Sequence, residues 1–171
     1  DLHLSLRRQR QMCIRDSSYP VLKELSTNDL QYDSKSAFTL SINHRDTYTG
    51  ITDTDRCLTT KRFAELSNEL LEKNSDNKSA MSKLGSEFRT PGHIPVCLEQ
   101  KGGLDTREGH TELAVALARL AGVTPVVIGA EMLQPNGDAA LSVDDAKKWA
   151  EERGILFLTG DEIKQIFNQR R

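Results

Sequence analysis

Residues 88–133, FRTPGHIPVCLEQKGGLDTREGHTELAVALARLAGVTPVVIGAEML, decide the fold class, because strand and helix patterns alternate within them. Strands are expected at 94–99 and 126–131, and the second is apolar enough to be buried on both faces of a sheet. Between them, apolar residues recur with the spacing of one helix face: Leu113, Ala114, Leu117, Ala118 and Ala121. Strands that alternate with helices predict an α/β domain.

The sequence upstream of this stretch extends the same pattern. Residues 38–43 alternate between apolar and polar, as a half-buried strand does, and a polar loop follows at 44–56. A helix is expected at 60–72 from the spacing of its apolar residues. The polar residues 73–83 are expected to form an exposed connection.

The downstream sequence adds a turn, a helix and a further strand. Residues 134–138 (QPNGD) are typical of a turn, and Ser142 opens a helix at 142–153 that Gly154 ends. A last strand is expected at 155–158. We therefore expect one α/β domain over residues 18–171, with a mixed sheet and flanking helices.

The first seventeen residues, DLHLSLRRQRQMCIRDS, differ in style from the rest. They lack the order of charge, apolar core and cleavage site of a signal peptide, and the run QMCIRDS resembles translated sequencing adapter. We interpret residues 1–17 as a non-native leader. A basic helical arm is the alternative.

Composition limits the classes of partner. A net charge of -2 gives no reason to expect a nucleic-acid or membrane surface. No apolar run approaches the roughly 20 residues that span a bilayer. Cys13, Cys57 and Cys97 are odd in number and form no CxxC pair, so they are expected to be plain thiols in a reducing compartment. The chain is expected to be cytoplasmic.

Residues 106–112 (TREGHTE) lead into the central helix and are predicted to bind an anion. Unpaired N–H groups and the helix dipole favour a phosphate there, as does the guanidinium of Arg107. Gly109 would let the ligand approach the backbone. Thr111 either donates its hydroxyl to that phosphate or caps the helix, and the residues alone leave both open.

His110 is a candidate ligand for a hard cation next to the same phosphate, with Arg107 and Glu112 nearby in the sequence. The alternative is a histidine that only caps the helix.

Glu131 and His93 are candidates for proton transfer. Glu131 ends the apolar run at 126–130, where burial would raise the pKa of its carboxyl group, and an ion pair is the alternative. His93 follows a Thr-Pro-Gly turn that would project its ring from a fixed corner, unless it is a turn histidine without a task.

Other motifs exclude several kinds of site. Asp53 and Asp55 could bind a cation two residues apart, but the remaining EF-hand ligands are missing, so this is a polar loop that lines a site at most. The glycines at 102 and 103 belong to neither a dinucleotide-binding nor a P-loop motif. The sequence contains no GxSxG hydrolase motif.

Four blocks in order resemble one family: SINHRDTYTGITDTDRCLTT at 41–60, FRTPGHIPV at 88–96, TREGHTELAVALARLAG at 106–122 and AEM at 130–132. They are similar to 3,4-dihydroxy-2-butanone 4-phosphate synthases of the riboflavin pathway, in particular the archaeal type. The resemblance extends from residue 19 to the C-terminus. It implies the α/β fold of that family.

The resemblance also implies an activity and a set of site residues. It implies a Mg²⁺- or Mn²⁺-dependent lyase that converts ribulose 5-phosphate to 3,4-dihydroxy-2-butanone 4-phosphate and formate. His93 and Glu131 match the positions essential for catalysis, and Glu131 also binds substrate. The substrate phosphate would bind at a block in which His110 is also the metal ligand: Arg107, Glu108, Gly109, His110 and Thr111. Family members are homodimers, so the loop at 47–55 would serve the partner subunit.

One part of the family pattern has no counterpart here. Family members carry an acidic loop of the DxDxRExE kind upstream, which supplies the other metal ligands, and this sequence contains none. We therefore expect an N-terminally truncated synthase with impaired activity. A non-catalytic phosphosugar-binding or dimerisation module is the alternative.

Overall fold

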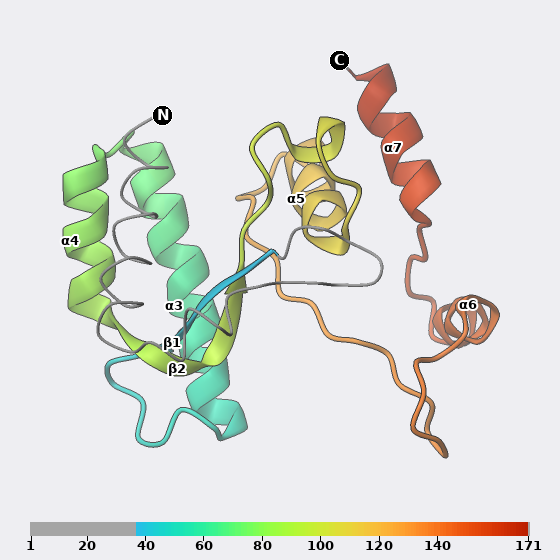
Figure 1. Ribbon diagram of the computed structural model, residues 1–171, viewed down its shortest axis with the longest axis horizontal. Helices are drawn as coiled ribbons and strands as arrows, with labels where there is room; N and C mark the ends of the chain where they lie inside the picture. The colour runs from blue at the N-terminus through green and yellow to red at the C-terminus, as the bar shows by residue number, and fades with distance from the viewer. Residues whose placement is uncertain (1–36, 171) are drawn as a thin grey trace, which may run out of the picture. The chain divides into compact units, whose positions relative to one another are not determined.

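The structure, a computed structural model, describes residues 37–170, and the interpretation of residues 1–17 lies outside them (Figure 1). The described elements are two strands, a short 3-10 turn at Gly103–Asp105 and five α-helices. In chain order the strands and helices are β1 (Phe38–His44), α3 (Asp53–Glu72), α4 (Asn77–Glu87), β2 (Phe88–Cys97), α5 (His110–Leu120), α6 (Val143–Glu152) and α7 (Gly160–Gln169). This confirms the α/β class.

The two strands form an antiparallel sheet with an interruption in β2. Ile42 pairs with Ile94, but the next residue of β1, Asn43, pairs with Arg89. Residues 90–93 therefore bulge out of the ladder. A Cβ on Gly92 would lie 2.0 Å from the backbone carbon of Ile42, so only glycine allows the bulge to turn back onto β1.

The hydrophobic core lies between this sheet and α3. Ile42, Leu66 and Phe88 are buried together, and the ring of Phe63 meets that of Phe88 edge to face at 5.7 Å. The apolar side chains predicted to share one face of the helix at 60–72 therefore pack toward the sheet, except for Leu71, which is 59% exposed.

Two boundaries differ from the prediction because side chains cap helices inside apparent loops. Helix α3 begins at Asp53, since the hydroxyl of Thr52 accepts a hydrogen bond from the Asp55 N–H. The exposed connection predicted at 73–83 is wrong: Asp76 accepts from the N–H groups of Lys78 and Ser79 and starts α4. None of the residues of α4 is buried, which explains why apolar spacing did not reveal it.

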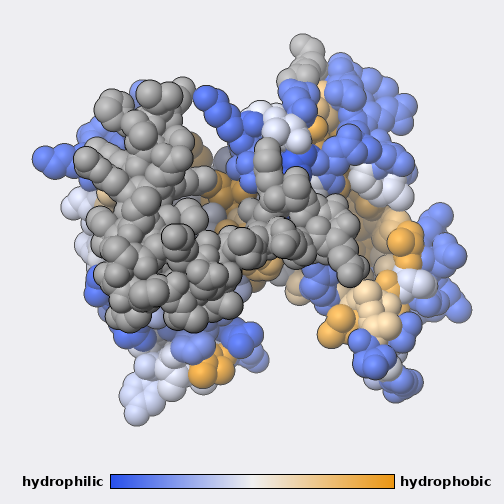
Figure 2. Space-filling view, in the orientation of Figure 1, coloured by the Kyte–Doolittle hydropathy of each residue, from blue (hydrophilic) through white to orange (hydrophobic). Residues whose placement is uncertain are grey.

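The strands predicted at 126–131 and 155–158 are also wrong. Within residues 37–170 no strand pairs with either segment, and hydrophobicity alone does not make a strand. Val127 and Ile128 are 52% and 74% exposed, and Leu156 is 79% exposed. Figure 2 shows apolar side chains on the surface around α6. The turn at 134–138 is confirmed, because Leu133 and Ala140 form an isolated bridge across it.

Both C-terminal helices begin with a side-chain cap, and the cap of α6 is the predicted one. Ser142 caps α6 by accepting from the Asp145 N–H, and Gly154 follows the helix with a φ of 62°, as predicted. Helix α7 opens with a capping box between Thr159 and Glu162. It packs against α5, and a Cβ on Gly160 would lie 3.2 Å from Leu113 Cδ1. None of the helices within residues 37–170 is long and apolar enough to cross a membrane.

Candidate functional site

The N-terminus of α5 is uncapped by any side chain. Its N-cap residue is Gly109, and within residues 37–170 no side chain accepts a hydrogen bond from the first turn. The other four described α-helices each have a side-chain cap. The alternatives in which His110 or Thr111 caps this helix are therefore wrong, because the N-cap position is occupied by Gly109.

The guanidinium of Arg107 pairs with a buried carboxylate. Its Nη1 lies 2.5 Å from Oε2 of Glu112, whose side chain is 0% exposed. The other carboxylate oxygen of Glu112 accepts from the Gln100 N–H at 2.9 Å. Glu112 is thus a buried anchor for Arg107 and for the turn before α5, rather than a second ligand beside His110.

Gly109 makes room for this arrangement. A Cβ at this position would lie 2.1 Å from Nη1 and 2.5 Å from Cζ of Arg107. The guanidinium therefore lies directly over the backbone at the start of α5. Any larger residue at position 109 would displace it.

The remaining residues of this segment differ in environment. Glu108 accepts a hydrogen bond from Lys164 Nζ of α7 at 2.9 Å. The pKa of Lys164 is raised because Asp161 and Glu108 both accept from its ammonium group. His110 is exposed and Thr111 is half-buried. An anion at this helix start would meet both side chains.

His93 lies in the bulge of β2 and is held by Asn43 of β1. The His93 N–H donates to Asn43 Oδ1 at 2.8 Å, and the ring Nδ1 lies 3.0 Å from Asn43 Nδ2. The His93 side chain is exposed, whereas Asn43 is buried. The predicted fixed corner is thus present, but it belongs to a strand bulge and is fixed by a side chain of the neighbouring strand.

Glu131 lies in a different environment from the one predicted. It is exposed and follows an irregular segment instead of a buried strand. Within residues 37–170 it forms no ion pair either.

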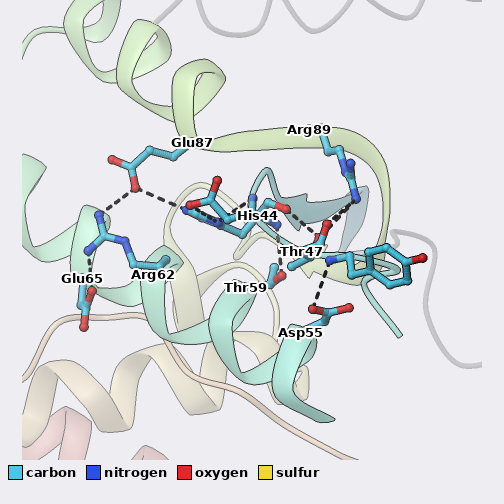
Figure 3. A network of polar contacts seen from close by, with 10 residues as sticks. His44, Thr47, Asp55, Thr59, Arg62, Glu65, Glu87 and Arg89 are labelled. Atoms are coloured by element: carbon cyan, nitrogen blue, oxygen red, sulfur yellow. Dashed lines mark hydrogen bonds and ion pairs between the residues drawn. The ribbon is translucent and has the colours of Figure 1, made fainter. Parts of the chain in front are cut away.

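The loop at 47–55 folds around the carboxylate of Asp55 (Figure 3). Gly50 donates its N–H to Asp55 Oδ2 at 2.7 Å, Thr49 donates to the same oxygen at 3.0 Å, and Tyr48 donates to Oδ1 at 3.3 Å. The hydrogen bond from Gly50 is the main cause that lowers the pKa of Asp55, although burial opposes it. Asp55 therefore organises the loop, and its oxygens are not arranged for a cation.

A second set of polar contacts supports the base of this loop, as Figure 3 shows. Buried His44 donates its backbone N–H to the Thr59 hydroxyl at 3.1 Å, and its carbonyl accepts from the Thr47 hydroxyl at 2.7 Å. Arg89 Nη2 lies 3.2 Å from the same Thr47 oxygen. These bonds connect the end of β1 to α3 and to β2.

The structure thus brings together the residues at 107–111, but not all of the predicted site. Within residues 37–170 no hydrogen bond or ion pair joins His93 or Glu131 to the start of α5. The hollows on the surfaces of α3 and α4 contain none of the predicted site residues. Sequence reasoning missed Asn43, because its role depends on a pairing partner 50 residues away.

Comparison with known proteins decides the family. A profile of the 3,4-dihydroxy-2-butanone 4-phosphate synthase family matches residues 10–166. The chain belongs to this family. It is 45% identical over 139 residues to the synthase of Methanosarcina mazei, a match that covers 81% of this chain and 54% of the relative. It is 41% identical over 151 residues to the synthase of Archaeoglobus fulgidus, covering 88% of this chain and 61% of the relative.

A solved synthase structure supports the fold. The crystal structure of the Candida albicans synthase matches with a TM-score of 0.60 and 29% identity, covering 76% of this chain and 59% of that chain. The chain spans 54% of the length of the Methanosarcina mazei relative. The archaeal relatives agree with the archaeal type that the motifs suggested.

The family implies a divalent metal, and the described residues offer only part of a site for it. Residues 37–170 contain no group of three or more His, Cys, Asp or Glu side chains that could hold a metal ion. His110 is the candidate ligand among them. These residues alone therefore do not fit a complete metal site, and no chemical step is assigned through a metal here.

Proposed function

We propose that this synthase-family chain converts ribulose 5-phosphate to 3,4-dihydroxy-2-butanone 4-phosphate and formate, a step of riboflavin biosynthesis. The observation that supports the proposal is the family match over residues 10–166. Arg107, Gly109, His110 and Thr111 lie at the start of α5, where no side chain of the described residues caps the helix. A phosphorylated sugar fits that position because a helix start with an adjacent guanidinium binds phosphate.

The substrate phosphate would bind over the first turn of α5. The N–H groups of this turn would donate to its oxygens, with the Thr111 hydroxyl alongside. Arg107 would add a charge-assisted hydrogen bond from a guanidinium that Glu112 already holds in place. The cost of ordering that side chain is thus met before the substrate binds.

His93 and Glu131 would handle protons of the pentulose chain. Formation of an enediol from a ketose requires a base that removes a proton next to the carbonyl and a donor to the carbonyl oxygen. Both side chains are exposed in the described residues, so both can reach a substrate. The later dehydration, carbon shift and loss of formate need further proton transfers at the same groups.

We propose Mg²⁺ or Mn²⁺ as the cofactor, with His110 as one ligand, and a cytoplasmic homodimer as the working form. Titration of the chain with Mn²⁺ tests this part of the proposal. His110→Ala is expected to abolish binding, and equal affinity in both proteins would contradict the ligand role.

The activity itself is tested under single-turnover conditions, with the chain in excess over ribulose 5-phosphate and with Mg²⁺ present. Formate and the four-carbon phosphate should form in equal amounts, detected by proton and phosphorus NMR. His93→Ala and Glu131→Gln should each lower the rate by about 100-fold or more.

Two results would contradict the lyase proposal. The first is no formate above that released by the His93→Ala protein. The second is binding of ribulose 5-phosphate without any turnover, which is the behaviour of the alternative phosphosugar-binding module. That alternative is favoured because residues 37–170 contain no group of three or more His, Cys, Asp or Glu side chains that could hold a metal ion.

A further inference from the structure

The side chain of Asn43 makes two hydrogen bonds to a single residue, His93. Asn43 is 3% exposed, so its amide is buried. Its Oδ1 lies 2.8 Å from the His93 backbone nitrogen, and its Nδ2 lies 3.0 Å from the His93 ring Nδ1. The amide thus contacts both the backbone and the ring of this histidine.

The backbone contact fixes which way the amide points. A backbone N–H only donates, so the atom that faces the His93 nitrogen must be the amide oxygen. The amide NH₂ then faces the ring, and an NH₂ group also only donates. Nδ1 must therefore accept, and the neutral imidazole carries its proton on Nε2.

The amide is also enclosed, so it cannot rotate. A Cβ on Gly50 would lie 2.0 Å from Asn43 Nδ2 and 2.5 Å from its Cγ, so the backbone of Gly50 covers the amide. Gly50 is held in turn by its hydrogen bond to Asp55 and has a φ of 84°. The loop organised by Asp55 therefore encloses the group that orients His93.

We propose that Asn43 is a positioning residue that holds neutral His93 as the Nε2–H tautomer, so that His93 donates a hydrogen bond to an oxygen of the substrate. Within residues 37–170 Nε2 has no hydrogen-bond partner, and the side chain is exposed. The N–H bond stays intact in this role: it stabilises developing negative charge on the oxygen. The base that removes the carbon-bound proton must then be another group. The substrate part of this inference rests on the proposed lyase function, whereas the tautomer does not.

Nuclear magnetic resonance of the full chain labelled with ¹⁵N-histidine tests the tautomer directly. Spectra are recorded at about pH 8, where an ordinary imidazole is neutral, and His93→Gln identifies the His93 signals. In the wild-type chain His93 should show a protonated Nε2 and an unprotonated Nδ1. His44 is an internal control, because its Nδ1 accepts from the Asp46 N–H at 3.2 Å and so has the same tautomer.

Asn43→Asp is the informative substitution, because it preserves shape but replaces the NH₂ donor by an acceptor. His93 should change to the Nδ1–H tautomer while His44 keeps a protonated Nε2. Single-turnover formate release should fall by about 100-fold, as expected when one hydrogen-bond donor to a developing oxyanion is lost. The affinity for ribulose 5-phosphate should stay within about threefold, which is a change in binding free energy of less than about 0.7 kcal/mol.

Each possible failure has a separate reading. An Nδ1–H tautomer in the wild-type chain would overturn the proposal, and this test does not depend on the folding of a variant. A tautomer that is unchanged by Asn43→Asp would overturn the role of Asn43. A changed tautomer with an unchanged formate rate would overturn donation to the substrate. An inactive wild-type chain with the Nε2–H tautomer would instead contradict the lyase function.

Discussion

Replacement of Glu112 by glutamine should destabilise the protein far more than the loss of one charge at the surface. The carboxylate is 0% exposed and accepts from two donors, the Gln100 N–H and Arg107 Nη1. An amide has one acceptor oxygen, so Glu112→Gln can accept from only one of them and directs its NH₂ at the other.

The magnitude follows from these contacts. A hydrogen bond to a charged group contributes about 1.5 to 3 kcal/mol, and a buried donor without an acceptor costs about 1 to 3 kcal/mol. Arg107 is 15% exposed and can regain some hydration, so the two contributions do not add fully. We expect the free energy of unfolding to fall by about 2 to 3 kcal/mol.

Urea denaturation measures this change, and Glu108→Gln is the matched control. Glu108 pairs with Lys164, but its side chain is 63% exposed, so its loss should cost under about 1 kcal/mol. Equal effects of the two substitutions would refute the reasoning, because they would mean that the Glu112 carboxylate is not a buried anchor.

Other predictions concern the core and the loop. Leu66→Ala, at a 2% exposed position between the sheet and α3, should lower the free energy of unfolding in urea by about 2 to 4 kcal/mol. Leu71→Ala, at a 59% exposed position of the same helix, should change it by under about 0.5 kcal/mol, and the reverse order would place the core elsewhere. The pKa of Asp55 is lowered chiefly by the Gly50 N–H, so its stabilising effect is complete above the ordinary aspartate value of 3.8 and is lost as the pH falls through the lower folded value. Asp55→Asn should therefore flatten the decline of stability with acidification below about pH 4, and an unchanged slope would contradict the loop-anchoring role.

The sequence predicted those elements whose signals are local. Strand β1, the helical face that carries Leu66 and the Ser142 cap of α6 depend on neighbouring residues, and the structure contains all three. Helix α4 was missed because none of its residues is buried, so it has no apolar face toward the core, and only the Asp76 cap marks its start. The predicted strand at 126–131 failed because a strand requires a partner, and hydrophobicity does not supply one.

The site divides in the same way. The uncapped start of α5 and the place of Arg107 beside it follow from residues within one helical turn. The burial of Glu112, the exposure of Glu131 and the contact between Asn43 and His93 depend on packing between distant segments. Spacing along the chain could not reveal these features, since they arise from pairing and enclosure.

The central claim is that the start of α5 holds the substrate phosphate, and a titration of the ¹⁵N-labelled chain with ribulose 5-phosphate tests it most directly. The amide signals of His110, Thr111 and Glu112 should shift together as the ligand binds, with smaller shifts elsewhere. Arg107→Ala should weaken the apparent affinity by about tenfold or more, the equivalent of one charge-assisted hydrogen bond. Saturable binding that leaves these three amides unshifted, or an affinity unaffected by Arg107→Ala, would contradict the claim.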